Sequence, residues 1–305
     1  VLENSQSVDK RVPHTFITNH RDIVMDSAFL SISLLDNGFG NTMEIAIGDN
    51  LLIRPWIKKL VRVDKAFIVQ RSVSLRQMLA SSARLSRYMH YAIATKHENI
   101  WIAQREGRAK DSNDRTQDSI LKMMAMGGEG SIIDRLKQLN LVPTALSYEY
   151  DPCDYLKAQE FQQKRDIEGF KKSPKDDLVN MQTGIFGYKG RICFRVAGPL
   201  NDWLDTLPAD MPKTELFTAV ASRIDKEIHR NYKLYAGNYV AADLLRATKE
   251  FAAHYTSEEK TRFEAYLESR LEKVTLPNPD TVFLRERLLT MYANPVFNYM
   301  AARQE

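Results

Sequence analysis

The stretch HTFITNHRDIVMDSAFLSISLL, residues 14–35, contains the smallest unit of an α/β fold. HTFIT (14–18) is an apolar run bounded by polar residues, which is typical of a buried strand, and DSAFLSISLL (26–35) has a helical pattern. His20 follows the strand closely, and Asp26 lies at the start of the helix. Ligands of open α/β sheets bind beyond the carboxyl ends of the strands, so both side chains are candidates for a functional site.

Four further runs are typical of buried strands: KAFIVQ (65–70), NIWIAQ (99–104), LVPTALSY (141–148) and RICFRVA (191–197). Helical patterns lie between them at 74–96 and 118–126. Strands that alternate with helices predict an α/β fold with a mixed, largely parallel sheet flanked by helices.

Residues 151–190 are rich in charged side chains and interrupt this alternation. Within this range, the segment YLKAQEFQQKRDIEGF has the pattern of a helix, which we interpret as part of an insertion. After about residue 205 the strand pattern stops and four helical patterns follow one another. The sequence therefore predicts an α/β domain over 1–205, with a polar helical insertion at about 151–190, and a helical C-terminal region over 206–305.

The composition of the chain narrows its class. Its 305 residues carry a net charge of +4, which is too small an excess to indicate nucleic-acid binding but suits an anionic ligand or membrane face. Two cysteines cannot form a disulfide framework, and no apolar stretch reaches the roughly 18 residues that a membrane-spanning helix requires. We expect a cytoplasmic protein without a nucleic-acid partner.

Polar side chains cluster just after the predicted strands. Besides His20, they are Arg71 after the second strand, Arg105, Glu106 and Arg108 after the third, and Tyr148 and Glu149 at the end of the fourth. If the strands are mostly parallel, these segments meet at one edge of the sheet. The sequence then predicts one histidine, several carboxylates and a group of arginines around one crevice.

The histidine and its neighbouring acids indicate proton transfer. An imidazole titrates near neutral pH and accepts a proton from a hydroxyl, while a carboxylate bonded to its other ring nitrogen fixes the tautomer. No GxSxG segment supplies a serine nucleophile, which favours a histidine that activates the hydroxyl of the substrate itself. His-Arg-Asp also opens the catalytic loop of protein kinases, but Ser27 replaces the required asparagine and too few residues precede it.

Two basic segments each leave two interpretations open. In REGRAKDSNDRTQ (105–117), Gly107 lets the backbone approach a ligand, and Arg108 and Lys110 offer donors to phosphate; the alternative is a solvated loop. RPWIKKLVRV (54–63) has the composition of a helix in a membrane interface, or of a helix packed on the sheet with a solvated basic side.

Four segments together resemble the glycerolipid acyltransferase family, whose members acylate glycerol-3-phosphate, dihydroxyacetone phosphate or lysophosphatidic acid. In chain order they are TNHRDIVMDSAFLS, KAFIVQRS, REGRAK and LVPTALSYE. They are similar to the family's His-x4-Asp motif, its Phe-Ile-Arg-Arg run, its Glu-Gly-x-Arg motif and its Val-Pro strand. The match covers about residues 12–200. The sequences NHRDIV, REGRAKD and YEYDPCDY are most similar to a branch of this family found in Bacteroidetes.

The resemblance implies direct transfer of a fatty acyl group from acyl-CoA or acyl carrier protein to a glycerol phosphate-type acceptor. His20 would take the proton of the acceptor hydroxyl, and Asp26 would orient His20. The implied substrate-binding residues are Arg71, Glu106, Gly107, Arg108 and Lys110. We expect no cofactor or metal. We expect peripheral contact with an anionic membrane face.

Three departures from the family pattern leave alternatives open. Five residues separate His20 from Asp26 where the family has four, so Met25 holds the strict position and Asp22 is a second candidate partner. Gln70 replaces the first arginine of the second motif, and Arg108 comes one residue early. The alternatives are an acyltransferase for another hydroxyl, such as that of an amino-acid lipid, or a non-catalytic lipid- or anion-binding protein.

Overall fold

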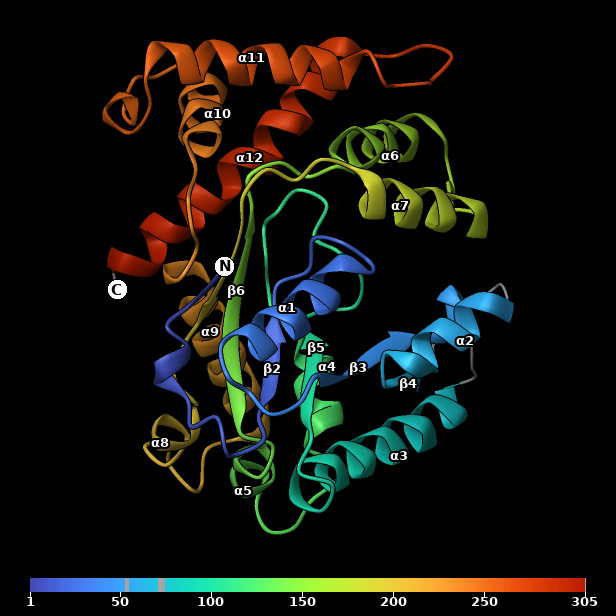
Figure 1. Ribbon diagram of the computed structural model, residues 1–305, viewed down its shortest axis with the longest axis vertical. Coiled ribbons are helices and arrows are strands. Elements are labelled where there is room, and N and C mark those ends of the chain that lie inside the picture. The colour runs from blue at the N-terminus through green and yellow to red at the C-terminus, as the bar shows by residue number, and fades with distance from the viewer. Residues whose placement is uncertain (53–54, 71–74, 305) are drawn as a thin grey trace.

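The computed structural model describes residues 1–52, 55–70 and 75–304. A seven-stranded sheet of order β1-β7-β6-β2-β5-β3-β4 forms its centre (Figure 1). Its strands are β1 (Leu2–Glu3), β2 (Thr15–Thr18), β3 (Met43–Gly48), β4 (Ala66–Val69), β5 (Asn99–Ala103), β6 (Leu141–Tyr148) and β7 (Ile192–Val196). Every neighbouring pair is parallel except β6 and β7, which are antiparallel. The predicted α/β fold with a mixed, mostly parallel sheet is confirmed.

The helices surround this sheet and extend beyond it. The α/β part carries α1 (Met25–Asp36), α2 (Pro55–Val63), α3 (Leu75–Ala94), α4 (Asp118–Met124), α5 (Ile132–Lys137), α6 (Asp154–Asp166), α7 (Pro174–Phe186) and α8 (Asn201–Leu204). The C-terminal part carries α9 (Lys213–Arg230), α10 (Ala236–Arg246), α11 (Ser257–Leu271) and α12 (Thr281–Gln304). Short 3-10 turns occupy Ser5–Ser7, Asp49–Leu51 and Ala252–His254.

Two apolar cores lie on opposite faces of the sheet. Side chains of β2, β5 and β6 alternate between the faces, because successive strand residues point in opposite directions. Ile17 and Ile100 face α3, α4 and α9, whereas Phe16 and Trp101 face α1. Figure 1 shows α1 in front of the sheet and α9 behind it, so the centre of the molecule is a three-layer α/β/α arrangement.

All five predicted strands are present, but the sequence interpretation missed β1 and β3. The β3 stretch MEIAIG pairs with both β4 and β5 and belongs to the parallel sheet. Its signal is the alternation of Met43, Ile45 and Ile47, which a search for continuous apolar runs does not detect. The predicted insertion holds two helices, α6 and α7, where one was predicted.

The four C-terminal helices do not form an isolated body. Helix α9 packs Leu216 and Ile224 into the same core as Ile100 and Leu141 of the sheet. Helices α10 to α12 form a core of their own around Val240, with α6 packed against it through Ala158 (Figure 1). Among the described helices, none combines the length and the apolar character needed to cross a membrane.

Candidate functional site

The side chain of Asn19, which follows β2, forms the hydrogen bonds to β6 that a strand backbone would form, and this places His20 at the end of β2. Asn19 is fully buried, its Nδ2 donates to the carbonyl of Leu146 (2.9 Å), and its Oδ1 accepts from the Leu146 amide (2.7 Å). The side chain of Asn19 thus continues the pairing with β6 while its backbone is free to turn. His20 follows directly and leaves the sheet at its carboxyl edge, as the sequence predicted.

Asp26 accepts every donor that faces it. His20 Nδ1 (2.8 Å) and the Arg21 amide (2.7 Å) bond to Oδ2, the Tyr148 hydroxyl bonds to Oδ1 (2.8 Å), and the Asp22 amide lies 3.0 Å from both oxygens. The carboxylate is fully buried in the first turn of α1, where the helix dipole favours an anion. Burial and the charge of Asp26 raise the pKa of Tyr148 well above its ordinary value, so its hydroxyl remains a donor.

The second candidate partner, Asp22, has another duty. Its Oδ1 accepts from the amides of Val24 (2.9 Å) and Met25 (3.0 Å) and so closes the turn that starts α1. Burial and the neighbouring Asp26 raise the pKa of Asp22. A Cβ at Gly184 of α7 would collide with this carboxylate, which explains why the helix carries glycine where it crosses the turn. Asp26, and not Asp22, is therefore the hydrogen-bond partner of His20.

The ring of His20 has one defined tautomer. When the imidazole is neutral, the carboxylate of Asp26, which can only accept, places the proton on Nδ1 and leaves the lone pair on Nε2. The ring packs edge-on against Trp101, with centroids 5.7 Å apart, and the indole N–H of Trp101 is held by Thr18 Oγ1 (3.1 Å). Within the described part of the chain, no side chain or carbonyl bonds to Nε2, so this nitrogen is available as a proton acceptor.

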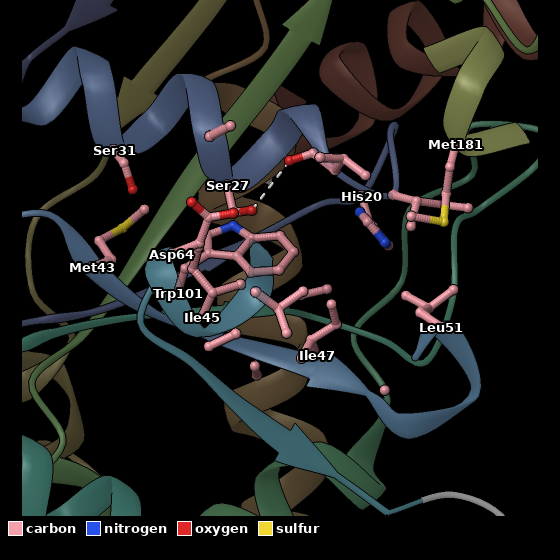
Figure 2. Close-up of a pocket in the computed structure, with 18 of the residues that line it drawn as sticks. His20, Ser27, Ser31, Met43, Ile45, Ile47, Leu51, Asp64, Trp101 and Met181 are labelled. Atoms are coloured by element: carbon pink, nitrogen blue, oxygen red, sulfur yellow. Dashed lines mark hydrogen bonds between the residues drawn. The ribbon is translucent and has the colours of Figure 1, made fainter. Parts of the chain in front are cut away.

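His20 stands at one end of an apolar cavity of about 360 Å³. Helix α1, strand β3 and helix α2 form most of the wall, with side chains that include Val24, Ala28, Ile32, Met43, Ile45, Ile47, Ile57 and Val61. In Figure 2, His20 lies close to Leu51 and Met181, and Ser31 and Met43 lie at the opposite side. From Val24, which directly precedes α1, to Ile32 the lining residues cover about 12 Å along the helix axis.

Two guanidinium groups with spare donors lie on the turn after β5. Arg105 lines the cavity, and its Nε is buried without a hydrogen-bond partner in the described structure. Arg108 donates through Nη2 to Asn180 Oδ1 (3.1 Å), while its buried Nη1 has no partner there. Buried donors are normally satisfied, so an anionic group is the natural complement for both.

The other predicted binding residues differ in their positions. Gly107 lines the cavity with a φ of +69°, a backbone conformation that favours glycine, and Glu106 beside it is exposed. Lys110 instead forms an ion pair with the nearly buried Glu160 of α6, and burial lowers its pKa to about 8 despite that pair. Arg71 lies outside the described residues.

Three features of the site were missed by the sequence interpretation. The sequence places Tyr148 only at a strand end, because its bond to Asp26 depends on the parallel pairing of β2 with β6. The sequence places Arg105 after a strand, but no local pattern indicates that it lines the cavity. The apolar wall from β3 was missed with the strand itself.

Comparison of the chain with models of known protein families and with curated proteins gave no match. Within residues 1–52, 55–70 and 75–304, no group of three or more His, Cys, Asp or Glu side chains is placed to hold a metal ion.

Proposed function

We propose that this chain is an O-acyltransferase that moves a fatty acyl group from a thioester of coenzyme A or acyl carrier protein to the hydroxyl of a glycerol phosphate-type acceptor. One observation carries the proposal. An imidazole with a fixed tautomer, supported by a buried carboxylate, stands at the end of an apolar cavity. The resemblance of the four sequence segments to glycerolipid acyltransferases agrees with this assignment.

The chemistry follows from the free Nε2 of His20. As the acceptor oxygen attacks the thioester carbonyl carbon, Nε2 takes the hydroxyl proton and the new C–O bond forms. The C–S bond then breaks, and the imidazolium returns its proton to the leaving sulfur. Asp26 accepts from Nδ1 throughout, so it stabilises the imidazolium that exists between these two transfers.

The spare donors of Arg105 and Arg108 support an acceptor with an anionic group. Guanidinium groups bind phosphate through paired, charge-assisted hydrogen bonds, and Arg105 borders the same cavity as His20. A carboxylate fits the same donors, which keeps an amino-acid lipid as the second acceptor class. Glycerol-3-phosphate and its 1-acyl form are the acceptors that we favour.

The cavity suits the hydrocarbon chain of the donor. An extended chain of single bonds advances about 1.2 Å per bond, so the roughly 12 Å from Val24 to Ile32 along the cavity wall accommodates about ten carbons. Each buried methylene contributes about 0.8 kcal/mol to binding. Medium and long acyl chains should therefore be favoured over short ones.

Peripheral attachment to an anionic membrane is also part of the proposal. Helix α2 directs Ile57 inwards, where it is 1% exposed, and leaves Lys58, Lys59 and Arg62 on the surface. Since its apolar side already walls the cavity, we propose contact through the basic side and the exposed Val63 at the end of α2. Co-sedimentation with vesicles of anionic and of neutral lipids tests this contact.

The decisive assay measures thiol release from acyl-CoA and acyl carrier protein thioesters with a panel of acceptors. The panel contains glycerol-3-phosphate, 1-acylglycerol-3-phosphate, glycerol and a hydroxylated amino-acid lipid. We expect release only with an anionic acceptor, lost in His20→Ala and kept in His254→Ala, which alters an exposed histidine. If none of the acceptors in the panel gives thiol release, the non-catalytic lipid- or anion-binding alternative is favoured instead.

A further inference from the structure

The segment from Asp111 to Thr116, which continues the turn that carries Arg105 and Arg108, is bound by the C-terminal helices. Asn294 Nδ2 of α12 donates to the carbonyl of Asp111 (2.8 Å). The amide and the hydroxyl of Thr116 both donate to Asp225 Oδ1 of α9, at 2.7 and 2.6 Å. The C-terminal region thus fixes both ends of this segment.

Asp114 lies at the centre of the same segment and is fully buried. His229 Nε2 of α9 bonds to its carbonyl (2.8 Å), and the hydroxyl of Tyr232 donates to its Oδ2 (2.5 Å). Burial and the charge of Asp114 raise the pKa of Tyr232 well above its ordinary value, so the hydroxyl stays protonated. The remaining capacity of the carboxylate is used by Arg21, whose Nη1 and Nη2 donate to its two oxygens at 2.9 and 2.6 Å.

Arg21 connects this carboxylate to the His20 site. Its backbone amide donates to Asp26 Oδ2 (2.7 Å), the oxygen that also accepts from His20 Nδ1 (2.8 Å). Its carbonyl accepts from the buried Lys157 Nζ (3.2 Å). Arg21 is therefore held on both sides of its backbone and at its guanidinium, and only Arg21 and Asp26 separate Asp114 from the imidazole.

We propose that Asp114 is a positioning residue through which the C-terminal helices set the placement of His20 relative to the Arg105–Arg108 turn. The inference rests on the proposed function, since it gives these helices a role in aligning acceptor and base. The continuous stretch from Arg105 to Asp114 carries both the guanidinium groups for the acceptor anion and the carboxylate that anchors Arg21 beside His20. One small acceptor must place its anionic group at these guanidinium groups and its hydroxyl at His20 at the same time. A misplacement of about 1 Å can cost 100-fold in rate.

The test is Tyr232→Phe, which removes the hydrogen bond from the Tyr232 hydroxyl to Asp114 and keeps the packing of the aromatic ring. Tyr255→Phe is the matched control, because Tyr255 donates to Asp243 (2.9 Å) in the same helical region without contact to the 111–116 segment. We expect Tyr232→Phe to lower kcat by about 10- to 100-fold with an unchanged KM for the thioester, and to alter the pH profile of the rate. Tyr255→Phe should keep kcat within about twofold, since the Tyr255 hydroxyl bonds to Asp243 and not to the groups that connect Asp114 with His20.

A second measurement does not depend on turnover. The proton on His20 Nδ1 gives a separate resonance in nitrogen-edited NMR of the full chain. Tyr232→Phe and Arg21→Lys should shift this resonance or speed its exchange with solvent, whereas Tyr255→Phe should leave it in place. An unchanged resonance and kcat in Tyr232→Phe, or equal effects in Tyr255→Phe, would overturn the inference. Absent turnover in the unmodified chain would instead refute the proposed function while the resonance still reports on positioning.

Discussion

Replacing Asp26 by Asn tests what its charge does for His20. The amides of Arg21 and Asp22 and the Nδ1 proton of His20 all point at Oδ2, so the amide nitrogen of an Asn side chain cannot take that position. The carbonyl oxygen must occupy it, and the amide nitrogen then faces the Tyr148 hydroxyl, which accepts as well as donates. The structure thus predicts that Asp26→Asn keeps the tautomer of His20 and loses the negative charge, together with the bond from the Asp22 amide to Oδ1; the Asp22 bond to Oδ2 remains.

The expected loss of rate follows from the two kinds of hydrogen bond. A bond to a charged partner is worth about 1.5–3 kcal/mol, against about 0.5–1.5 kcal/mol for a neutral pair, so the imidazolium loses about 1–2 kcal/mol. At about 1.4 kcal/mol for each tenfold change, kcat should fall about 5- to 30-fold. Asp26→Ala would be uninformative because it leaves several buried donors without an acceptor, each at about 1–3 kcal/mol.

The assay is steady-state thiol release with glycerol-3-phosphate for the native chain, Asp26→Asn and Tyr148→Phe, with thermal unfolding as the measure of integrity. Tyr148→Phe removes one donor from the carboxylate but keeps its charge, so its kcat should fall less than that of Asp26→Asn. A native rate in folded Asp26→Asn would show that the carboxylate has no catalytic duty. A loss near 10⁴-fold, as when the wrong histidine tautomer is enforced in a serine protease, would refute the predicted orientation of the amide.

Three further predictions concern the cavity, the binding residues and stability. Ser31→Phe fills the end of the cavity opposite His20; if about three methylenes are excluded at about 0.8 kcal/mol each, kcat/KM for the longest chains falls about 50-fold. Leu35→Phe, on the same helix outside the cavity, should leave the chain-length profile unchanged. Arg108→Gln should raise the KM for the acceptor about tenfold or more, through the loss of a charge-assisted bond, whereas Lys110→Met should change it less than threefold because Lys110 is paired with Glu160. Burial raises the pKa of Asp225 from 3.8 to about 6, so its contribution to stability is complete below pH 3.8 and is lost as pH rises through about 6. Asp225→Asn keeps an acceptor for Thr116, so its free energy of unfolding at pH 7.5 should be about 2 kcal/mol higher than that of the native chain. Chemical denaturation should find no difference between the two proteins near pH 4.

The sequence was sufficient for the parts of the fold that depend on local pattern. The strands at residues 14–18 and 141–148 are continuous apolar runs, and both occur as predicted. The parallel arrangement of the central strands followed from their alternation with helices. The β3 stretch escaped because Glu44 interrupts its apolar run, although it is buried and bonded to Tyr88 (2.7 Å).

In the candidate site, contacts between residues close in sequence could be predicted, whereas contacts between distant residues could not. His20 and Asp26 are separated by one turn of chain, so their proximity could be predicted, and the start of α1 at Met25 explains why Asp26 faces back towards the histidine. The pairing of Lys110 with Glu160 joins residues 50 positions apart and depends on how the α6 insertion folds over the site. No local pattern reports such a contact, and the same holds for the bond from Tyr232 to Asp114.

The most direct measurement for the central claim is the stoichiometry of product formed by the native chain and by His20→Gln, from a long-chain acyl thioester and glycerol-3-phosphate. We expect one acylated acceptor for each thiol released by the native chain. We expect no product above background for His20→Gln, whose side chain cannot accept and return the proton. Equal product from both proteins, or thiol release without an acylated acceptor, would contradict the account.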